Sequence, residues 1–133
     1  MAGRRRTDPQ LGRTALAAWL ACADQGKAPG RQETTTAVRY SLEELAHLAP
    51  GGSVEVRVPP AGVVQVIAGP KHTRGTPANV IEMDATTWLS LVTGRLTWDQ
   101  ALASGSVLAS GERANLSQYL PLPLPLPGCA KGV

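Results

Sequence analysis

A strict alternation of apolar and polar side chains at residues 53–58 predicts a β-strand with one buried face. In the run Ser-Val-Glu-Val-Arg-Val, the valines share one face and the polar residues share the other. Residues 59–62, Pro-Pro-Ala-Gly, then have the composition of a proline-initiated turn. Residues 63–68 are apolar on both faces, so we expect them to form an antiparallel partner at a central position in the sheet.

Two more strands are predicted further along the chain. Residues 79–83, Asn-Val-Ile-Glu-Met, follow a connection at residues 69–78 that is longer than a plain hairpin needs. Residues 106–110 predict a fourth, short strand before a turn at Gly111. Because long connections often carry function, the segment 69–78 is a candidate binding loop.

A helix is predicted near the N-terminus. Asp8 has the position of an N-cap, and Pro9 that of the first helical residue. Apolar residues then recur at helical spacing, at Leu11, Ala15, Ala18, Trp19 and Cys22. This pattern favours an amphipathic packed helix over the alternative, a secretory leader formed by the arginines and the apolar stretch that follows them.

A second helix is predicted over residues 38–49, after a loop at residues 24–34 that is rich in glycine, proline and polar residues. Ser41 and Glu44 have capping-box spacing, which makes Ser41 a candidate restart of this helix. Pro50 and the two glycines after it end the pattern. Two helices therefore precede the sheet.

Two short helices are predicted between the third and fourth strands. Asp84 caps a segment that ends at Gly94, and Thr97 with Gln100 forms a capping box for a segment that ends at residues 104–105. Both starting signals are local and well formed. The element order is then two helices, three strands, two helices and a fourth strand.

The C-terminal part begins with a helix predicted at residues 113–120, which Pro121 stops. Leucine and proline then alternate through residue 127, which excludes a helix or a central strand and predicts extended chain. Since the leucines favour burial, we expect this segment to dock on its own domain or on a neighbouring copy. The alternative is a mobile tail.

The domain organisation follows from length and composition. The chain has 133 residues, of which 43% are hydrophobic, enough for one core but not for two domains. We expect a basic tail at residues 1–6 and a single domain at residues 7–120. Within that domain, residues 8–49 supply the N-terminal helices and residues 53–120 the sheet and the remaining helices. Residues 121–133 form the Leu/Pro-rich tail.

The charge distribution argues against nucleic-acid binding. The net charge of +3 equals the three arginines Arg4, Arg5 and Arg6, so the domain itself carries no surplus of cations. Aromatic residues make up only 4% of the chain, which leaves few platforms for stacking bases. The arginines are expected to form a solvated tail, with weak contact with a membrane surface as the alternative.

The cysteines and the hydropathy pattern indicate a cytoplasmic protein. Cys22 and Cys129 lie near opposite ends of the chain and form neither a CxxC motif nor a disulfide framework. No apolar run reaches the length of a membrane-spanning helix. We therefore expect a reducing compartment.

One stretch of the chain is similar to a known family. It runs from Asp84 through Trp88 and Gly94 to Trp98 and continues through Ala101, Ser104, Gly105, Gly111 and Glu112. This skeleton resembles the sterol carrier protein family. Residues 56–60 and 72–77 resemble its actinobacterial branch, the bacterial sterol carrier orthologues.

The resemblance implies an α/β fold of the α+β type, in which helices pack on one side of a mostly antiparallel sheet. It also implies an apolar tunnel between these layers that holds a lipid-like ligand, with no catalytic residue and no cofactor. The chain would then be a non-enzymatic carrier. The alternative is a protein interaction module, or an accessory domain of a maleylpyruvate isomerase-like or thiol-dependent enzyme, with the tunnel filled by side chains. A protein partner or a homo-oligomer is compatible with either reading.

Two groups of residues are candidates for ligand binding. The first has the spacing of an apolar core, and some of its members could line a tunnel: Val64, Val66, Ile81, Trp88, Leu91, Val92, Leu102 and Leu108. The second is the cationic cluster Lys71, His72 and Arg74, whose loop could hold a phosphate or carboxylate. The alternative is that Arg74 forms an internal ion pair with Glu82 or Glu112.

Catalytic and metal chemistry find little support in the sequence. The chain has only two histidines, His47 and His72, without metal-ligand spacing, so we expect no metal site. The serines lack a G-x-S-x-G motif, and residues 69–75 do not match a phosphate-binding P-loop. We therefore predict no catalytic residue.

Overall fold

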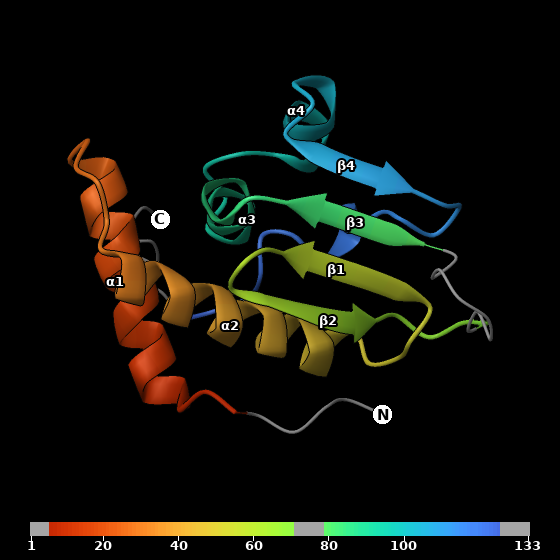
Figure 1. Ribbon diagram of the computed structural model, residues 1–133, viewed down its shortest axis with the longest axis horizontal. Coiled ribbons are helices and arrows are strands. Elements are labelled where there is room, and N and C mark those ends of the chain that lie inside the picture. Colours follow the sequence, from red (N-terminus) through yellow and green to blue (C-terminus); the bar gives the residue numbers. More distant parts are fainter. Residues whose placement is uncertain (1–5, 71–78, 126–133) are drawn as a thin grey trace.

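The computed structural model describes residues 6–70 and 79–125 (Figure 1). Helix α1 (Pro9–Asp24) starts as predicted, because the Asp8 carboxylate accepts a hydrogen bond from the Gln10 amide at 3.0 Å. Helix α2 (Arg31–Leu48) packs against it. The predicted loop at residues 24–34 is shorter than expected, since α2 begins at Arg31.

The predicted restart of α2 at Ser41 is wrong. Ser41 lies inside a continuous helix of 18 residues and is fully buried. Its hydroxyl donates to the carbonyl of Ala37 at 2.7 Å, one turn earlier in the helix. A capping serine would instead bind a free amide at a helix start, so the hydroxyl here has a different partner.

Four strands form one sheet in the order β2-β1-β3-β4: β1 (Val54–Val58), β2 (Gly62–Val66), β3 (Val80–Met83) and β4 (Val107–Ser110). The pairs β1–β2 and β3–β4 are antiparallel, and β1–β3 is parallel. The sheet is therefore mixed, with two of its three pairings antiparallel. The prediction that residues 63–68 form a central strand is wrong, because β3 takes the other side of β1 and leaves β2 at an edge.

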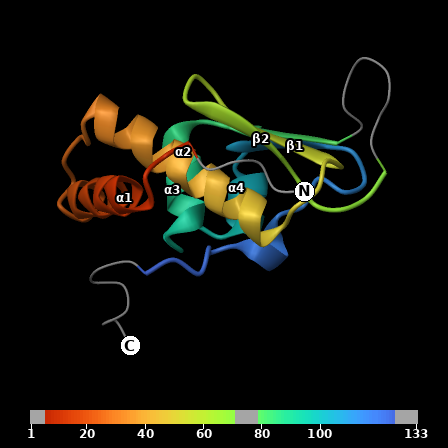
Figure 2. The ribbon, with the colours of Figure 1, turned by 90° about the horizontal axis from the view of Figure 1, so that it is seen from below.

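The helices lie on one side of this sheet (Figure 2). Helix α3 (Ala85–Val92) is capped as predicted by Asp84, which accepts from the Thr87 amide at 2.8 Å. Helix α4 (Trp98–Ala103) opens with the predicted capping box of Thr97 and Gln100. The fold class implied by the resemblance, α+β with helices packed on one side of the sheet, is confirmed.

The core forms where the sheet meets the helices. The alternation predicted for β1 is confirmed, since Val54, Val56 and Val58 are buried while Glu55 and Arg57 are half-exposed on the other face. Trp88 of α3 is completely buried in the same core. Its indole Nε1 donates to the Ser41 hydroxyl at 2.8 Å and thereby ties α3 to α2.

The C-terminal part differs from the predicted helix at residues 113–120. In its place there is one short 3₁₀ turn, η1 (Ser117–Tyr119). The Asn115 side chain accepts from the Ser117 amide at 2.8 Å, which favours a turn at this point. Beyond it the chain is extended, and Leu122 enters the core while its amide donates to the Val92 carbonyl at 3.2 Å. The predicted docking of the Leu/Pro segment on its own domain is confirmed for these residues.

Candidate functional site

Five of the eight predicted apolar residues converge in the core between the sheet and the helices. They are at most 1% exposed and comprise Val66, Ile81, Trp88, Leu91 and Val92. They come from β2, β3 and α3, so segments far apart in the chain meet there. The core interpretation is confirmed for these five.

The other three residues are not fully buried, although Val64 packs against the core. Leu102 and Leu108 are 42% and 67% exposed, so the prediction that they belong to the core is wrong. Leu108 is opposite Glu82 in the β3–β4 register and shares its solvent-facing side of the sheet. Val64 is half-buried and faces a groove at the edge of the sheet.

The C-terminal part contributes two further core residues: the sequence analysis missed Leu116, whereas the burial of Leu122 follows the predicted docking of the Leu/Pro segment. Leu116 is fully buried and Leu122 is 5% exposed, and both belong to the same core cluster as Trp88. The prolines at 121, 123 and 125 are exposed. The alternation of leucine and proline was the signal for Leu122, because it excludes a helix and leaves apolar side chains that favour burial.

A groove of about 1310 Å³ runs between α2 and the edge strand β2. Apolar groups on its walls come from Leu42, Ala46, Ala61, Val63 and Val64. Arg6, Arg39 and Glu43 add charge, and Gln65 adds a neutral polar group. Unlike the packed interior, this hollow is open to solvent and has mixed polarity.

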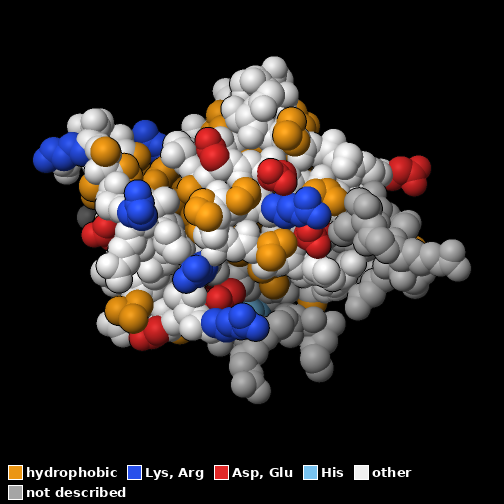
Figure 3. Space-filling model, viewed as in Figure 1, with side chains coloured by type: hydrophobic (Ala, Val, Ile, Leu, Met, Phe, Trp, Pro, Cys, Tyr) orange, Lys and Arg blue, Asp and Glu red, His pale blue; other side chains and the backbone are white. Residues whose placement is uncertain are grey.

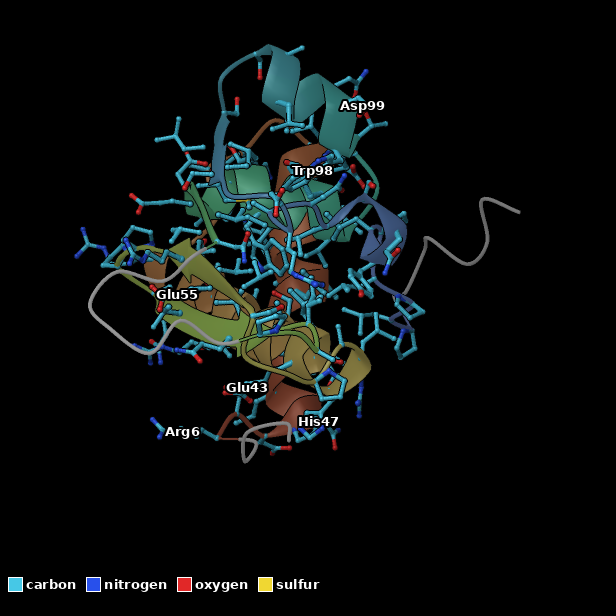
Figure 4. The ribbon with its side chains drawn as sticks, turned by 90° about the vertical axis from the view of Figure 1, so that its right-hand side faces the viewer. Arg6, Glu43, His47, Glu55, Trp98 and Asp99 are labelled. Carbon is cyan, nitrogen blue, oxygen red and sulfur yellow. The ribbon has the colours of Figure 1, made fainter. Side chains whose placement is uncertain are left out.

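Two hydrogen-bonded contacts shape the groove. Arg39 donates from Nε to the Ala61 carbonyl at 2.8 Å, which fixes α2 against the turn before β2. The Glu43 carboxylate accepts from the amides of Arg6 and Thr7 at 3.2 and 3.0 Å and from the Thr7 hydroxyl at 3.1 Å. Figure 4 shows Arg6 and Glu43 beside α2, with Glu55 on the sheet. The sequence analysis did not single out Arg39 or Glu43, although opposite charges four residues apart on a helix were a visible signal.

The outer face of the sheet carries an ion network. Arg57 lies between Glu55, at 2.5 Å from Nε, and Glu82, at 3.8 Å from Nη1. Figure 3 shows acidic and basic side chains gathered with apolar ones on this face. Exposed pairs of this kind contribute little to stability, about 0–1 kcal/mol.

Residues 30–122, more than half of the chain, match the family model described as "Bacterial SCP ortholog", where SCP stands for sterol carrier protein. The chain belongs to this family. The resemblance to bacterial sterol carrier orthologues is thereby confirmed, while the actinobacterial branch stays a prediction. No curated protein matches the chain.

The family match covers most of the groove and most of the core of this bacterial sterol carrier orthologue. It includes α2, β2 and Leu122, and it leaves out α1. The cationic cluster Lys71, His72 and Arg74 lies outside the described residues. Its predicted anion binding and the alternative pairing of Arg74 both stay predictions.

Two further observations concern the part of the chain that the structure describes. Within it, no group of three or more His, Cys, Asp or Glu side chains could hold a metal ion. Within residues 6–70 and 79–125, no helix is long and apolar enough to cross a membrane.

Proposed function

We propose that this bacterial sterol carrier orthologue binds an apolar, acyl- or isoprenoid-like molecule without catalysis, between the sheet and the helices. The ligand enters by displacing the C-terminal segment, residues 120–125. Membership in the family supports apolar ligand binding in general. The observation that carries the proposed site is Leu122, a core leucine on a chain segment with few other attachments.

The attachments of this segment are weak for a part of the core. Its backbone hydrogen bond to the rest of the domain runs from the Leu122 amide to the Val92 carbonyl, at 3.2 Å. Proline has no amide hydrogen, so Pro121 and Pro123 lose no such bond when the segment lifts. Releasing the segment therefore exposes mainly the side chains of Leu122 and its half-buried neighbours.

An acyl chain is a suitable replacement for the Leu122 side chain. Both are saturated hydrocarbon, and the core cluster that contains Leu122 is formed mainly by aliphatic residues and tryptophan, with Tyr40 and Met83. Each buried methylene contributes about 0.8 kcal/mol, so a chain of several methylenes offsets the loss of one leucine from the core. The ligand needs no directional contact, which agrees with a core whose buried polar side-chain atoms all have partners among the described residues.

The experiment uses Trp88 as a reporter. In a Trp19→Phe/Trp98→Phe variant, Trp88 is the remaining tryptophan, and cis-parinaric acid accepts its emission when the two lie close together. We expect saturable energy transfer at micromolar probe concentration. Leu122→Ala should tighten binding and speed association several-fold, because it leaves apolar space in the site.

Leu108→Ala is the matched control, since it removes the same atoms from an exposed leucine. It should leave both affinity and rate unchanged. Absence of saturable transfer from Trp88 would contradict the proposed function. Binding that is equally insensitive to Leu122→Ala and Leu108→Ala would contradict the proposed route of entry.

A further inference from the structure

Strand β2 has a backbone edge that no described residue pairs with. The Glu55 amide donates to the Asn79 carbonyl at 3.0 Å, so Glu55 directs its backbone groups toward β3. Hydrogen-bonded pairs alternate along an antiparallel ladder, so Val54, Val56 and Val58 bind β2 through Val66, Val64 and Gly62. The amides and carbonyls of Val63 and Gln65 therefore point away from β1.

The residues of β2 themselves carry none of the sequence devices that usually protect an edge. Proteins blunt exposed edges with lysine, proline, bulges or inward charges along the strand. The sequence of β2 is Gly-Val-Val-Gln-Val, without a charge or a proline, and its register with β1 is continuous over five pairs. A row of free donors and acceptors in this setting is a template for another extended chain.

Helix α2 packs beside that edge and forms one wall of the groove. The groove between α2 and β2 is lined by Leu42 and Ala46 from the helix and by Gly62 and Val64 from the strand. Gly62 has no side chain, and a Cβ there would lie 3.3 Å from Leu42 and 3.8 Å from Arg39. Gly62 therefore brings the strand close to Leu42 and Arg39, and the open groove leaves room for the side chains of a strand laid along β2.

The charged residues of the groove determine which side chains an added strand can place there. The Glu43 carboxylate is already bound by the amides of Arg6 and Thr7 and by the Thr7 hydroxyl. Arg39 uses Nε on the Ala61 carbonyl, and no hydrogen bond or ion pair within the described residues engages its two terminal nitrogens. The end of the groove beside Gly62 therefore favours a carboxylate.

We propose that the groove between α2 and β2 binds an extended segment of a partner protein as an added strand. The segment carries an acidic side chain opposite Gly62, where it contacts Arg39, and an apolar side chain two residues away, opposite Val64 and above Leu42 and Ala46. Alternate residues of a strand share one face, which is why these two positions lie two apart. This site is separate from the apolar interior and does not depend on ligand binding there.

Amide hydrogen exchange measured by NMR tests the added strand. The probe is an acetylated and amidated peptide, Thr-Val-Thr-Glu-Thr-Val-Thr, which presents an apolar residue two positions from the glutamate in either strand direction. We expect fast exchange at Val63 and Gln65 in the free protein and at least about tenfold slower exchange with saturating peptide. The amides of Val64 and Val66, which bind β1, should exchange slowly throughout.

A charge exchange tests the role of Arg39. Arg39→Glu should weaken binding of the glutamate peptide at least tenfold and should bind the peptide in which lysine replaces the glutamate. Arg31→Glu is the matched control, because it makes the same change in the first turn of α2, outside the groove. It should leave both affinities within about twofold.

Three results would overturn the proposal. The first is slow exchange at Val63 and Gln65 in the free protein, which would mean that the edge is already covered. The second is unchanged exchange at these residues with saturating peptide. The third is an equal effect of Arg39→Glu and Arg31→Glu, which would indicate attraction by net charge alone. Each readout is independent of energy transfer from Trp88, so failure here is distinguishable from failure of the proposed function.

Discussion

The interior beneath the C-terminal segment and the groove beside β2 differ in what fills them. The interior is occupied by packed side chains, among them Trp88, Leu116 and Leu122. The groove is open and exposes backbone groups of β2 together with Arg39. The first region is suited to recognising hydrocarbon by the area it buries, and the second is suited to recognising a chain by directional hydrogen bonds.

This difference separates the energetic roles of the two regions. Side chains in the interior support the whole fold, so changes there alter stability and binding together. The groove shares Leu42, Ala46 and Ala61 with the core, but its other lining residues lie outside the core, so these can change with little effect on folding. Substitutions matched between the two regions test this separation directly.

The largest effect is expected for Trp88→Ala. The indole is fully buried, and its Nε1 donates to the buried Ser41 hydroxyl. Removal of such an aromatic side chain costs about 3–5 kcal/mol of unfolding free energy. Urea denaturation measures the loss, and Gln65→Ala in the groove, expected within about 0.5 kcal/mol, is the comparison. A loss below about 1 kcal/mol for Trp88→Ala would contradict a tightly packed interior.

Leu122→Ala should have the next largest effect. Leucine-to-alanine changes in a core cost about 2–5 kcal/mol, and we expect the lower end because an extended segment can shift to fill part of the space. The same denaturation measurement applies. Pro123→Ala, at an exposed position in the same segment, controls for changes in the backbone. Equal losses for the two variants would show that the Leu122 side chain does not support the core.

Local signals predicted local structure well. Asp8, Asp84 and Thr97 each act within three residues of the chain, and each forms the expected cap. The misread signal at Ser41 had the same spacing, but its hydroxyl binds a carbonyl within the helix and the distant Trp88. A capping pattern spans only a few residues, so it cannot indicate a hydrogen-bond partner 47 positions away.

Long-range pairing explains the error in the predicted strand order. The apolar character of residues 63–68 suggested a central strand, yet β3 pairs with β1 in parallel and leaves β2 at the edge. Apolar residues on both faces of β2 are compatible with an edge strand because α2 packs beside it. Strand order depends on contacts across the sheet, which periodicity within one strand does not encode.

The candidate sites were predictable to different degrees. The interior followed from apolar spacing in β3 and α3, where Ile81, Trp88 and Leu91 are buried. Leu108 was misassigned because a two-residue period leaves open which face of a strand turns inward. The groove was missed, since it depends on how α2 lies against the edge of β2.

The smallest effect is expected for Glu43→Gln, which tests how the groove is framed. The carboxylate accepts three hydrogen bonds from residues 6 and 7, and glutamine keeps only one acceptor oxygen. We expect a loss of about 0.5–1.5 kcal/mol in unfolding free energy, together with faster exchange of the Thr7 amide. Glu33→Gln, at an exposed position on the same helix, should show neither change. Because Trp88 lies in the other region, its emission should stay the same. A shift in Trp88 emission with Glu43→Gln would mean that the groove and the interior are coupled, and that an added strand at β2 would also alter the apolar site.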